Sequence, residues 1–303
     1  HGISHQYAFG DFRGFAGQFS RAVVAQISRH KHVSSIVSDR LIGYDEESQS
    51  QTKATWGLHH MSHYSKDNPK IEEGIYWYNK TAGAGTFGYV IDGAVNVNHV
   101  DIRGRATKGY NALGSSYPFK ATNGHATYVS SIMCGRIFGV SKLCNIISVQ
   151  VVQWDFTNYA MVLDGFQWAV KDILEKKRQA KAVINISLEL DHSSPVLDKA
   201  IHDASRKGIT TVVAAGNGGR DIRMGTSPAT ASSAIVVGAV DVNFTRWKNS
   251  NYGKNVSLFA PGVSVKAAWL GGIRRNQACR TATGTSAAAP HVAGLVLYYK
   301  SLE

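Results

Sequence analysis

Apolar and polar positions alternate in blocks along this chain, and the blocks differ in length and spacing. Short runs rich in valine, isoleucine and alanine recur between polar turns, which is typical of strands buried on both faces of a sheet. Longer amphipathic segments follow some of these runs. The pattern predicts an α/β fold with a mostly parallel sheet flanked by helices. The predicted strands cover residues 89–92, 146–152, 183–188, 210–215 and 235–240, and the predicted helices cover 159–178 and 195–207.

The first fifty residues have a pattern of their own. A polar stretch over residues 44–53 separates them from the rest and is predicted to be a junction. We therefore expect a small α+β segment over residues 1–50, followed by a larger domain over residues 51–303. The predicted elements of the small segment are a strand within residues 12–19, a helix over 21–30 capped by Ser20, and a second strand over 33–42.

The segment from Gly284 to Gly294 is the most informative part of the chain for chemistry. It joins a tight turn to a helix-like run, with Ser286 near the predicted helix N-terminus and Pro290 close behind. The helix dipole and the unpaired N–H groups at such a position favour developing negative charge. The segment alone is also compatible with an ordinary packed helix, so its meaning depends on residues elsewhere.

Three other polar residues lie where predicted elements begin or end. Asp92 closes an apolar strand, His125 follows an Asn-Gly turn, and Asn217 follows another apolar strand. A serine hydroxyl is a poor nucleophile until a base takes its proton, and the base needs a fixed tautomer. An acid, an imidazole, an amide and a hydroxyl are therefore the groups that serine-dependent acyl transfer requires.

These motifs resemble those of the subtilases, the subtilisin-like serine peptidases, and the proteinase K group in particular. The resemblance implies that Ser286 is the nucleophile, His125 the general base, Asp92 its orienting acid and Asn217 the oxyanion donor. The stretches that carry it are Ala-Thr-Trp-Gly-Leu at 54–58, Val-Ile-Asp at 90–92, Asn-Gly-His at 123–125, Ala-Ala-Gly-Asn at 214–217, Ala-Pro-Gly at 260–262 and the serine motif at 284–294.

Residues 1–50 are similar to the second half of the inhibitory prodomain that precedes the catalytic domain in subtilases. The resemblance implies that this segment docks near the cleft as a partner in the same chain, with residues 43–51 running toward Ser286 and His125. Related enzymes continue well past the serine helix, whereas this chain ends at Glu303. The catalytic domain is therefore expected to be truncated at its C-terminal end.

The sequence departs from the family pattern where substrate is expected to bind. The usual Ser-Leu-Gly-Gly strand reads Ser-Leu-Glu-Leu, and the small residues expected on the opposite wall are replaced by Gln-Trp. We expect a narrowed cleft in which Glu189 favours cationic substrate groups, unless its carboxylate points to solvent. The residues predicted to bind substrate are Ser187, Leu188, Glu189, Gln153, Trp154, Tyr128 and Gly216.

Three functions are compatible with this pattern. The first is a peptidase that cuts peptide bonds through an acyl-serine intermediate in an altered cleft. The second is a repurposed subtilase fold that drives acyl transfer, cyclisation or proton transfer on a small or modified-peptide substrate. The third is a non-catalytic binder, which has no physical need for the aligned groups at Asp92, His125, Asn217 and Ser286.

Composition excludes several other classes. The formal net charge is +12, but the basic residues are scattered, so no nucleic-acid partner is expected. No apolar run is long enough to cross a membrane, and no membrane partner is expected. The sequence has no signal peptide at His1, and the family resemblance implies a secreted, secretory-pathway or vacuolar enzyme.

No cofactor and no metal site are expected. The 3 cysteines, Cys134, Cys144 and Cys279, can form at most one disulfide, and they lack the spacing of a metal site. Enzymes of the proteinase K group have an aspartate at the position of Ser257, where it holds calcium. A neutral hydroxyl is a poor replacement for this ligand.

Overall fold

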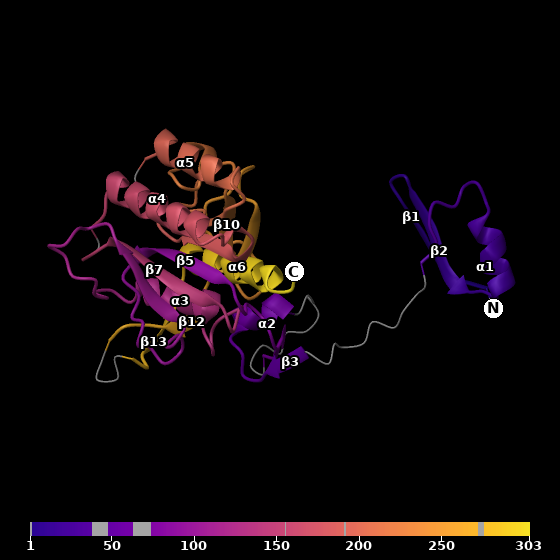
Figure 1. The fold of residues 1–303 in the computed structure, drawn as a ribbon, viewed down its shortest axis with the longest axis horizontal. Helices are drawn as coiled ribbons and strands as arrows, with labels where there is room; N and C mark the ends of the chain where they lie inside the picture. Colours follow the sequence, from indigo (N-terminus) through magenta and orange to yellow (C-terminus); the bar gives the residue numbers. More distant parts are fainter. Residues whose placement is uncertain (1, 38–47, 63–73, 155, 191, 272–275) are drawn as a thin grey trace. The chain divides into compact units, whose positions relative to one another are not determined.

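The computed structural model describes residues 2–37, 48–62, 74–154, 156–190, 192–271 and 276–303 (Figure 1). The chain divides into two compact units, His1–Glu46 and Glu47–Glu303. Each unit has its own secondary structure and is described by itself. The larger unit contains all the residues that were predicted to be catalytic.

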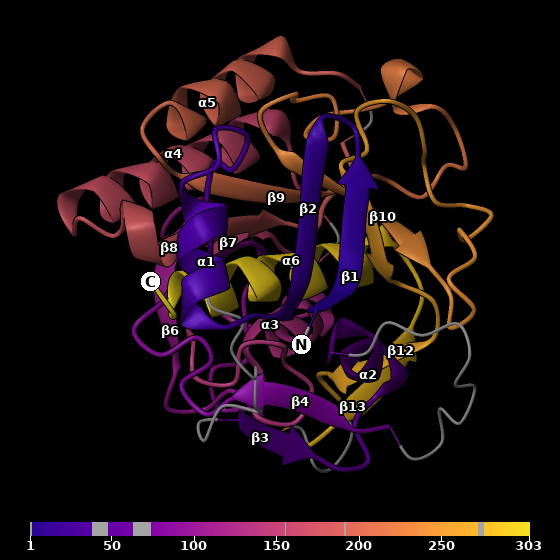
Figure 2. The same ribbon diagram turned by 90° about the vertical axis from the view of Figure 1, so that its right-hand side faces the viewer.

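The first unit is a β-hairpin followed by a helix (Figure 2). Strand β1 (Gly2–Phe9) pairs antiparallel with β2 (Phe12–Gln18), and helix α1 (Arg21–Ser28) follows. The Ser20 hydroxyl accepts a hydrogen bond from the Val23 N–H, which confirms the predicted cap.

Two predictions for this unit need correction. Strand β1 was not predicted, because its histidine and glutamine interrupt the apolar alternation. Residues 33–37 form no strand, and the rest of the predicted strand, 38–42, lies outside the described residues. In the described part of the unit, β2 pairs instead with the segment across the tight turn at Gly10, whose φ is 52°.

The first unit leaves most of its apolar side chains uncovered within itself. No residue of α1 is buried, and the hairpin contributes exposed aromatic side chains. A segment this short cannot bury enough surface to fold strongly alone. Exposed apolar side chains in this number are typical of an interaction surface. The exposed apolar residues are Ile3, Tyr7, Phe9, Phe12, Phe15, Val23, Val24, Ile36 and Val37.

The larger unit is built on a parallel sheet, as predicted. Each of the five predicted strands is present. Strand β8 ends at Ile186, before the predicted end at 188, because the residues after Ile186 do not pair with a neighbouring strand. In the described residues the sheet has 7 strands in the order β11-β10-β9-β8-β5-β7-β6, and all neighbouring pairs are parallel. The strands are β5 (Phe87–Gly93), β6 (Ala106–Asn111), β7 (Asn145–Val152), β8 (Ala182–Ile186), β9 (Thr210–Ala214), β10 (Ile235–Val240) and β11 (Leu258–Pro261).

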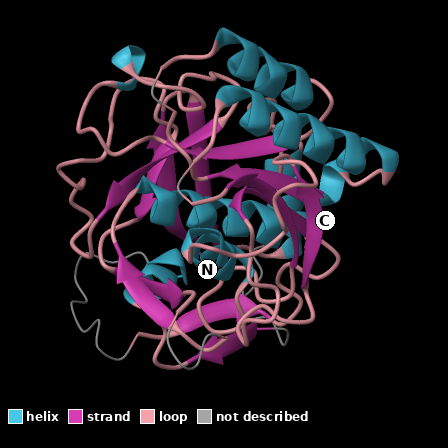
Figure 3. Cartoon of the chain, turned by 90° about the vertical axis from the view of Figure 1, so that its left-hand side faces the viewer, coloured by secondary structure: helices cyan, strands magenta, loops and turns pink. Residues whose placement is uncertain are grey.

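Helices cover both faces of the sheet (Figure 3). Alternation along β5 sends Val90 into the core with α3 (His125–Cys134) and α6 (Thr285–Lys300). Tyr89 and Ile91 point into the opposite core with α4 (Tyr159–Glu175) and α5 (Pro195–Ser205). The α/β class and the helix-flanked parallel sheet are therefore confirmed.

Two smaller antiparallel ribbons complete the unit. Strand β3 (Ser48–Gln51) pairs with β4 (Tyr76–Asn79), and β12 (Val265–Ala268) pairs with β13 (Cys279–Ala282). Residues 48–51 are thus a strand of the larger unit, not the end of a tail directed at the cleft. The remainder of that predicted tail, 43–47, lies outside the described residues.

Cys134 and Cys144 form a disulfide at the end of α3 and just before β7, and both side chains are buried. Cys279 is free and exposed. The disulfide joins the helix that begins with His125 to the strand that precedes Gln153. It therefore connects two elements that contribute to the predicted site.

The Ser257 hydroxyl accepts a hydrogen bond from the Val236 N–H, so it contributes to strand pairing. We predict that chelation with EDTA leaves the melting temperature of the protein unchanged, because Ser257 offers calcium no anionic oxygen. Differential scanning calorimetry with and without EDTA tests this. A melting temperature that falls by many degrees in EDTA, and recovers with calcium, would contradict it.

Candidate active site

The predicted acid lies at the carboxyl edge of the sheet, in its central strand. Asp92 is in β5, between the strands β7 and β8, where a parallel sheet changes winding direction. Its side chain is 4% exposed. Its Oδ1 accepts the Gly93 N–H at 2.6 Å, and its Oδ2 lies 2.8 Å from His125 Nδ1. Both carboxylate oxygens therefore have hydrogen-bond partners, as a buried charge requires.

His125 is the first residue of α3, and Asn123 Oδ1 accepts its backbone N–H at 2.8 Å. The imidazole is 31% exposed, so it reaches from the buried carboxylate toward the cleft. Because the carboxylate only accepts, Nδ1 carries the hydrogen of the neutral ring. Nε2 then has the lone pair with which a base takes a proton.

Ser286 is the second residue of α6, as the sequence predicted. Its Oγ donates to the Ser187 carbonyl at 3.0 Å, and Ser187 Oγ donates to the Ser286 carbonyl at 3.2 Å. Pro290 lies four residues later and has no N–H to offer the Ser286 carbonyl. Ser187, the residue after β8, therefore donates the hydrogen bond that the Ser286 carbonyl cannot receive from Pro290.

Asn217 follows β9 and faces the start of α6. Its Oδ1 accepts the Thr285 N–H at 2.9 Å and the Thr285 hydroxyl at 3.0 Å. A backbone N–H only donates, so the amide oxygen must face Thr285 and the Nδ2 group is turned the other way. Helix α6 also offers the Ser286 N–H, which has no acceptor within the first helical turn. An amide group and a backbone N–H are thus available for an oxyanion.

A cleft of about 390 Å³ lies next to Asp92 and His125. Five of the predicted substrate-binding residues line it: Ser187, Leu188, Glu189, Gln153 and Trp154. The indole of Trp154 is the most exposed of these side chains, at 72%. Trp154 has a φ of 52° in a turn closed by hydrogen bonds between Gln153 and Phe156. Such backbone strain in a bulky residue is frequent at binding sites.

Two of the predicted cleft residues do not line it. Tyr128 is a residue of α3, and its side chain is buried in the core, where its hydroxyl donates to the Val265 carbonyl at 2.8 Å. Burial raises the pKa of its phenol, which therefore stays neutral. Gly216 is also buried, with a φ of 98°, and a Cβ there would overlap Asn251 and the Glu189 carboxylate. Tyr128 and Gly216 are therefore packed behind the residues that line the cleft.

The Glu189 carboxylate has partners within the protein. Its Oε2 accepts the Asn217 N–H at 2.9 Å, and its Oε1 lies 3.5 Å from Arg220 Nη2 and 3.4 Å from Thr226 Oγ1. The side chain is 28% exposed. The expected attraction of cationic substrate groups would therefore compete with Arg220, which already offsets the charge.

Sequence reasoning missed several residues that the fold brings to this cleft. Trp269 and Arg280 line it, with the guanidinium stacked 4.6 Å from the indole centroid. Gly124, directly before His125, leaves room for Trp269, because a Cβ there would overlap the ring. Thr285 donates hydrogen bonds to Asn217. Its position directly before Ser286 was the only feature of the sequence that could have indicated this role. The other contacts join segments far apart in the chain and have no local signature.

Neither a metal site nor a membrane span is found in the part of the chain that the structure describes. These residues contain no cluster of three or more acidic, histidine or cysteine side chains placed to hold an ion. Their helices are all too short or too polar to cross a bilayer.

Comparison with protein families agrees with this geometry. Residues 83–303 match the subtilase family, and residues 1–43 match the peptidase inhibitor I9 family. The subtilase match alone covers most of the chain.

Individual proteins give the same result. A subtilisin-like protease of Coccidioides posadasii is 41% identical over 303 residues, which is 100% of this chain and 73% of that protein. Alkaline protease 1 of Aspergillus clavatus is 39% identical over 302 residues, covering 100% of this chain and 72% of its own length. A solved cold-adapted subtilisin-like serine proteinase superposes with a TM-score of 0.71 at 32% identity, covering 82% of this chain and 85% of its own. The chain belongs to the subtilase family of serine endopeptidases.

Proposed function

We propose that Ser286, His125, Asp92 and Asn217 carry out peptide-bond hydrolysis in this protein. The observation that carries the proposal is the 2.8 Å contact from Asp92 to His125, at the sheet edge where α6 presents Ser286. Asp92 holds the imidazole in one tautomer and orientation. His125 takes the proton of Ser286 as the hydroxyl attacks the substrate carbonyl, and later delivers it to the leaving amine.

Ser286 must exchange one hydrogen bond before it reacts. Its Oγ donates to the Ser187 carbonyl in this structure, and in the reaction it donates to His125 Nε2. The negative charge of the tetrahedral intermediate develops on the former carbonyl oxygen. Asn217 Nδ2 and the Ser286 N–H are the groups assigned to stabilise it, together with the N-terminal end of α6. Water then attacks the acyl-Ser286 ester with His125 as the base.

We infer that the cleft accepts a narrower range of peptides than an open subtilase groove. Residues 187–190 leave the β8 ladder, and Leu188 and Glu189 within them line the cleft, where an extended substrate backbone can lie. Glu189 occupies a position where the family usually has glycine, and Trp154 adds a large exposed side chain on the opposite wall. The runner-up function, acyl transfer or cyclisation on a modified peptide, rests on these same departures and uses the same acyl-serine step.

We also propose that the first unit inhibits the second by docking at the cleft. The match of residues 1–43 to a peptidase inhibitor family supports this, as do the exposed aromatic residues of the hairpin. The Cys134–Cys144 disulfide supports secretion, since such bonds persist in oxidising compartments.

The nucleophile assignment predicts the behaviour of Ser286→Ala. We expect kcat to fall by about 10⁶ while the melting temperature stays near that of the wild type, because the change removes one hydroxyl. A fluorophosphonate probe should label wild-type Ser286 and not the variant, as peptide mapping by mass spectrometry would show. Turnover above a few per cent of the wild type would contradict the assignment.

A casein assay separates general proteolysis from the runner-up function. We expect the wild-type protein, once freed of its first unit, to cleave casein and to react with the probe at Ser286. Probe labelling without cleavage of casein or of a broad peptide library would favour the acyl-transfer alternative. The absence of both would contradict the catalytic proposal itself.

The oxyanion role predicts the cost of Asn217→Ala. We expect kcat to fall by about 10²–10³ with little change in KM, because the amide acts on the transition state. Steady-state kinetics on one peptide substrate measures both constants. A loss below about threefold would mean that Asn217 stabilises no oxyanion.

Docking of the first unit predicts an effect of its exposed aromatic residues. In the full chain, the first unit should delay the onset of peptidase activity for as long as it stays docked. The double variant Phe9→Ser/Phe12→Ser should shorten this lag, because the docking face loses apolar area and is held less tightly. The matched control is Tyr299→Ser, which removes an exposed aromatic side chain from α6 of the larger unit. Equal lags in all three proteins would contradict docking through this face.

A further inference from the structure

The carboxylate of Glu189 is held directly behind the proposed oxyanion donor. We propose that Glu189 is a positioning residue: it fixes the backbone of Asn217 so that the side-chain amide keeps the orientation that catalysis needs. This inference rests on the proposed function of Ser286 and Asn217. It gives a role to a carboxylate that stands where the family usually has glycine.

Asn217 is held at two points. Thr285 binds its side-chain oxygen, and Glu189 Oε2 accepts its backbone N–H at 2.9 Å. Gly216, with its φ of 98°, precedes it and is held by Thr285 and Asn251, since its N–H donates to Thr285 Oγ1 at 3.1 Å and its carbonyl accepts the Asn251 N–H at 3.0 Å. If the Glu189 contact is lost, the Asn217 peptide can turn between its anchored neighbours. Thr285 is then left to set the direction of Nδ2 through the Asn217 side-chain oxygen.

The contact requires close packing that the local sequence provides. The Glu189 carboxylate lies against the backbone of Gly216, where any Cβ would overlap it. The Thr226 hydroxyl lies 3.4 Å from the other carboxylate oxygen, Oε1. Glu189 lines the cleft, and its carboxylate accepts the Asn217 N–H. The residue can thus serve the substrate wall and the oxyanion loop together.

A carboxylate near a developing oxyanion also has an unfavourable effect, because like charges repel. Arg220 offsets it, with Nη2 3.5 Å from Glu189 Oε1. The guanidinium is 47% exposed, so salt screens this pair. Removing Arg220 should therefore lower kcat more at low ionic strength. Replacing Glu189 by glutamine in the same protein should cancel that effect, because the neutral amide still accepts the Asn217 N–H.

The test is a set of variants assayed for kcat and KM on one neutral peptide substrate. Glu189→Ala should lower kcat by about 10- to 100-fold with KM little changed, as expected for a misplaced catalytic group. Glu189→Gln should stay within about threefold of the wild type, since one hydrogen bond is retained. In an Asn217→Ala background, Glu189→Ala should add no further loss. The matched control is Glu175→Ala, which removes an exposed carboxylate paired with Lys171 on α4.

Several results would overturn the proposal. One is a Glu189→Ala effect that persists undiminished in the Asn217→Ala background. Others are an effect on KM alone, or failure of Glu189→Gln to preserve kcat. Fluorophosphonate labelling of Ser286 in the wild type distinguishes failure of the proposed function from failure of the positioning role. Its absence would refute the proposed function, whereas labelling with additive Glu189 and Asn217 losses would refute only the positioning role.

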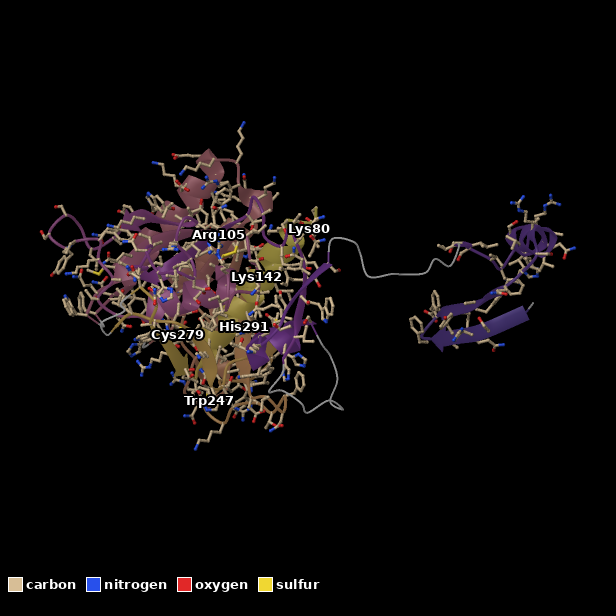
Figure 4. The ribbon with its side chains drawn as sticks, turned by 90° about the horizontal axis from the view of Figure 1, so that it is seen from below. Lys80, Arg105, Lys142, Trp247, Cys279 and His291 are labelled. Atoms are coloured by element: carbon tan, nitrogen blue, oxygen red, sulfur yellow. A yellow bond between two sulfur atoms is a disulfide. The ribbon has the colours of Figure 1, made fainter. Side chains whose placement is uncertain are left out.

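A second cavity carries an independent inference. It has a volume of about 510 Å³, and none of the described residues that line it is acidic. Figure 4 labels three of its cationic residues, which come from segments far apart in the chain. The basic lining residues are Lys80, Arg103, Arg105, Arg136 and Lys142.

Two cations of this cavity donate to neutral oxygens of the protein. Arg105 Nη1 donates to the Cys134 and Cys144 carbonyls at 2.7 Å each. Lys142 is 6% exposed, and its Nζ donates to Gln51 Oε1 at 2.5 Å and to the Ile137 carbonyl at 3.2 Å. Arg103 and Arg136 have no ion-pair partner in the described part of the chain. The carboxylate of Asp101 is buried and accepts hydrogen bonds from Ser131 and Ile137.

We infer that this cavity binds a tetrahedral oxyanion, for which phosphate and sulfate are the simplest probes. The guanidinium groups of Arg103 and Arg136 match its charge and its many acceptor positions, whereas Arg105 and Lys142 contribute mainly their charge. Burial lowers the pKa of Lys142 to about 7, with Asp101 opposing the shift and Arg105 adding to it. A bound anion would favour the charged lysine, so the affinity for sulfate, whose charge does not change near neutral pH, should rise as the pH falls through 7.

Calorimetric titration of the full chain with phosphate, at constant ionic strength set by chloride, tests the site. We expect saturable binding, and about tenfold weaker binding for Arg136→Ala, because a charge-assisted contact is lost. Arg223→Ala is the matched control, since that arginine pairs with Asp221 on another surface. Absence of saturable binding, or equal losses in both variants, would refute the site.

Discussion

The buried carboxylate of Asp92 constrains the whole proposed catalytic arrangement. A charge that is 4% exposed at the centre of a parallel sheet is tolerated only with partners for both oxygens. One partner, the Gly93 N–H, is local. The other is His125, which lies beside Asp92 as the first residue of α3. The contact that satisfies the buried carboxylate of Asp92 therefore also orients His125, the proposed base.

The second half of the site follows from α6. This helix is buried along most of its length, and its glycine at 294 allows it to pass close to the backbone of α3 near Met133. Helix α3 begins at His125 and α6 begins at Thr285, directly before Ser286, so the packing of the two helices contributes to placing these residues. Asn217 accepts hydrogen bonds from Thr285, the residue next to the proposed nucleophile. A few contacts between distant segments thus define the reacting geometry.

The sequence predicted the parts of this structure that depend on local signals. Strand and helix periodicity located five strands and two helices of the larger unit, and the order of the four polar residues indicated the family. The failures were non-local. Tyr128 looked like a cleft residue because it follows His125, yet its ring packs into the core under β12. The partners of Glu189 come from the segments at 217, 220 and 226, and nothing near Glu189 in the chain indicates them.

Pro290 shows how this site differs from a helix selected for stability alone. A proline inside a helix removes one backbone hydrogen bond and costs about 3 kcal/mol. In α6 the carbonyl released is that of Ser286, and the hydroxyl of Ser187 binds it. A residue with an N–H at position 290 would complete the helix and leave Ser187 to find another acceptor. The most stable helix and the hydrogen bond that holds Ser187 beside the proposed nucleophile therefore require different residues at position 290, and this chain has the proline that leaves the Ser286 carbonyl to Ser187.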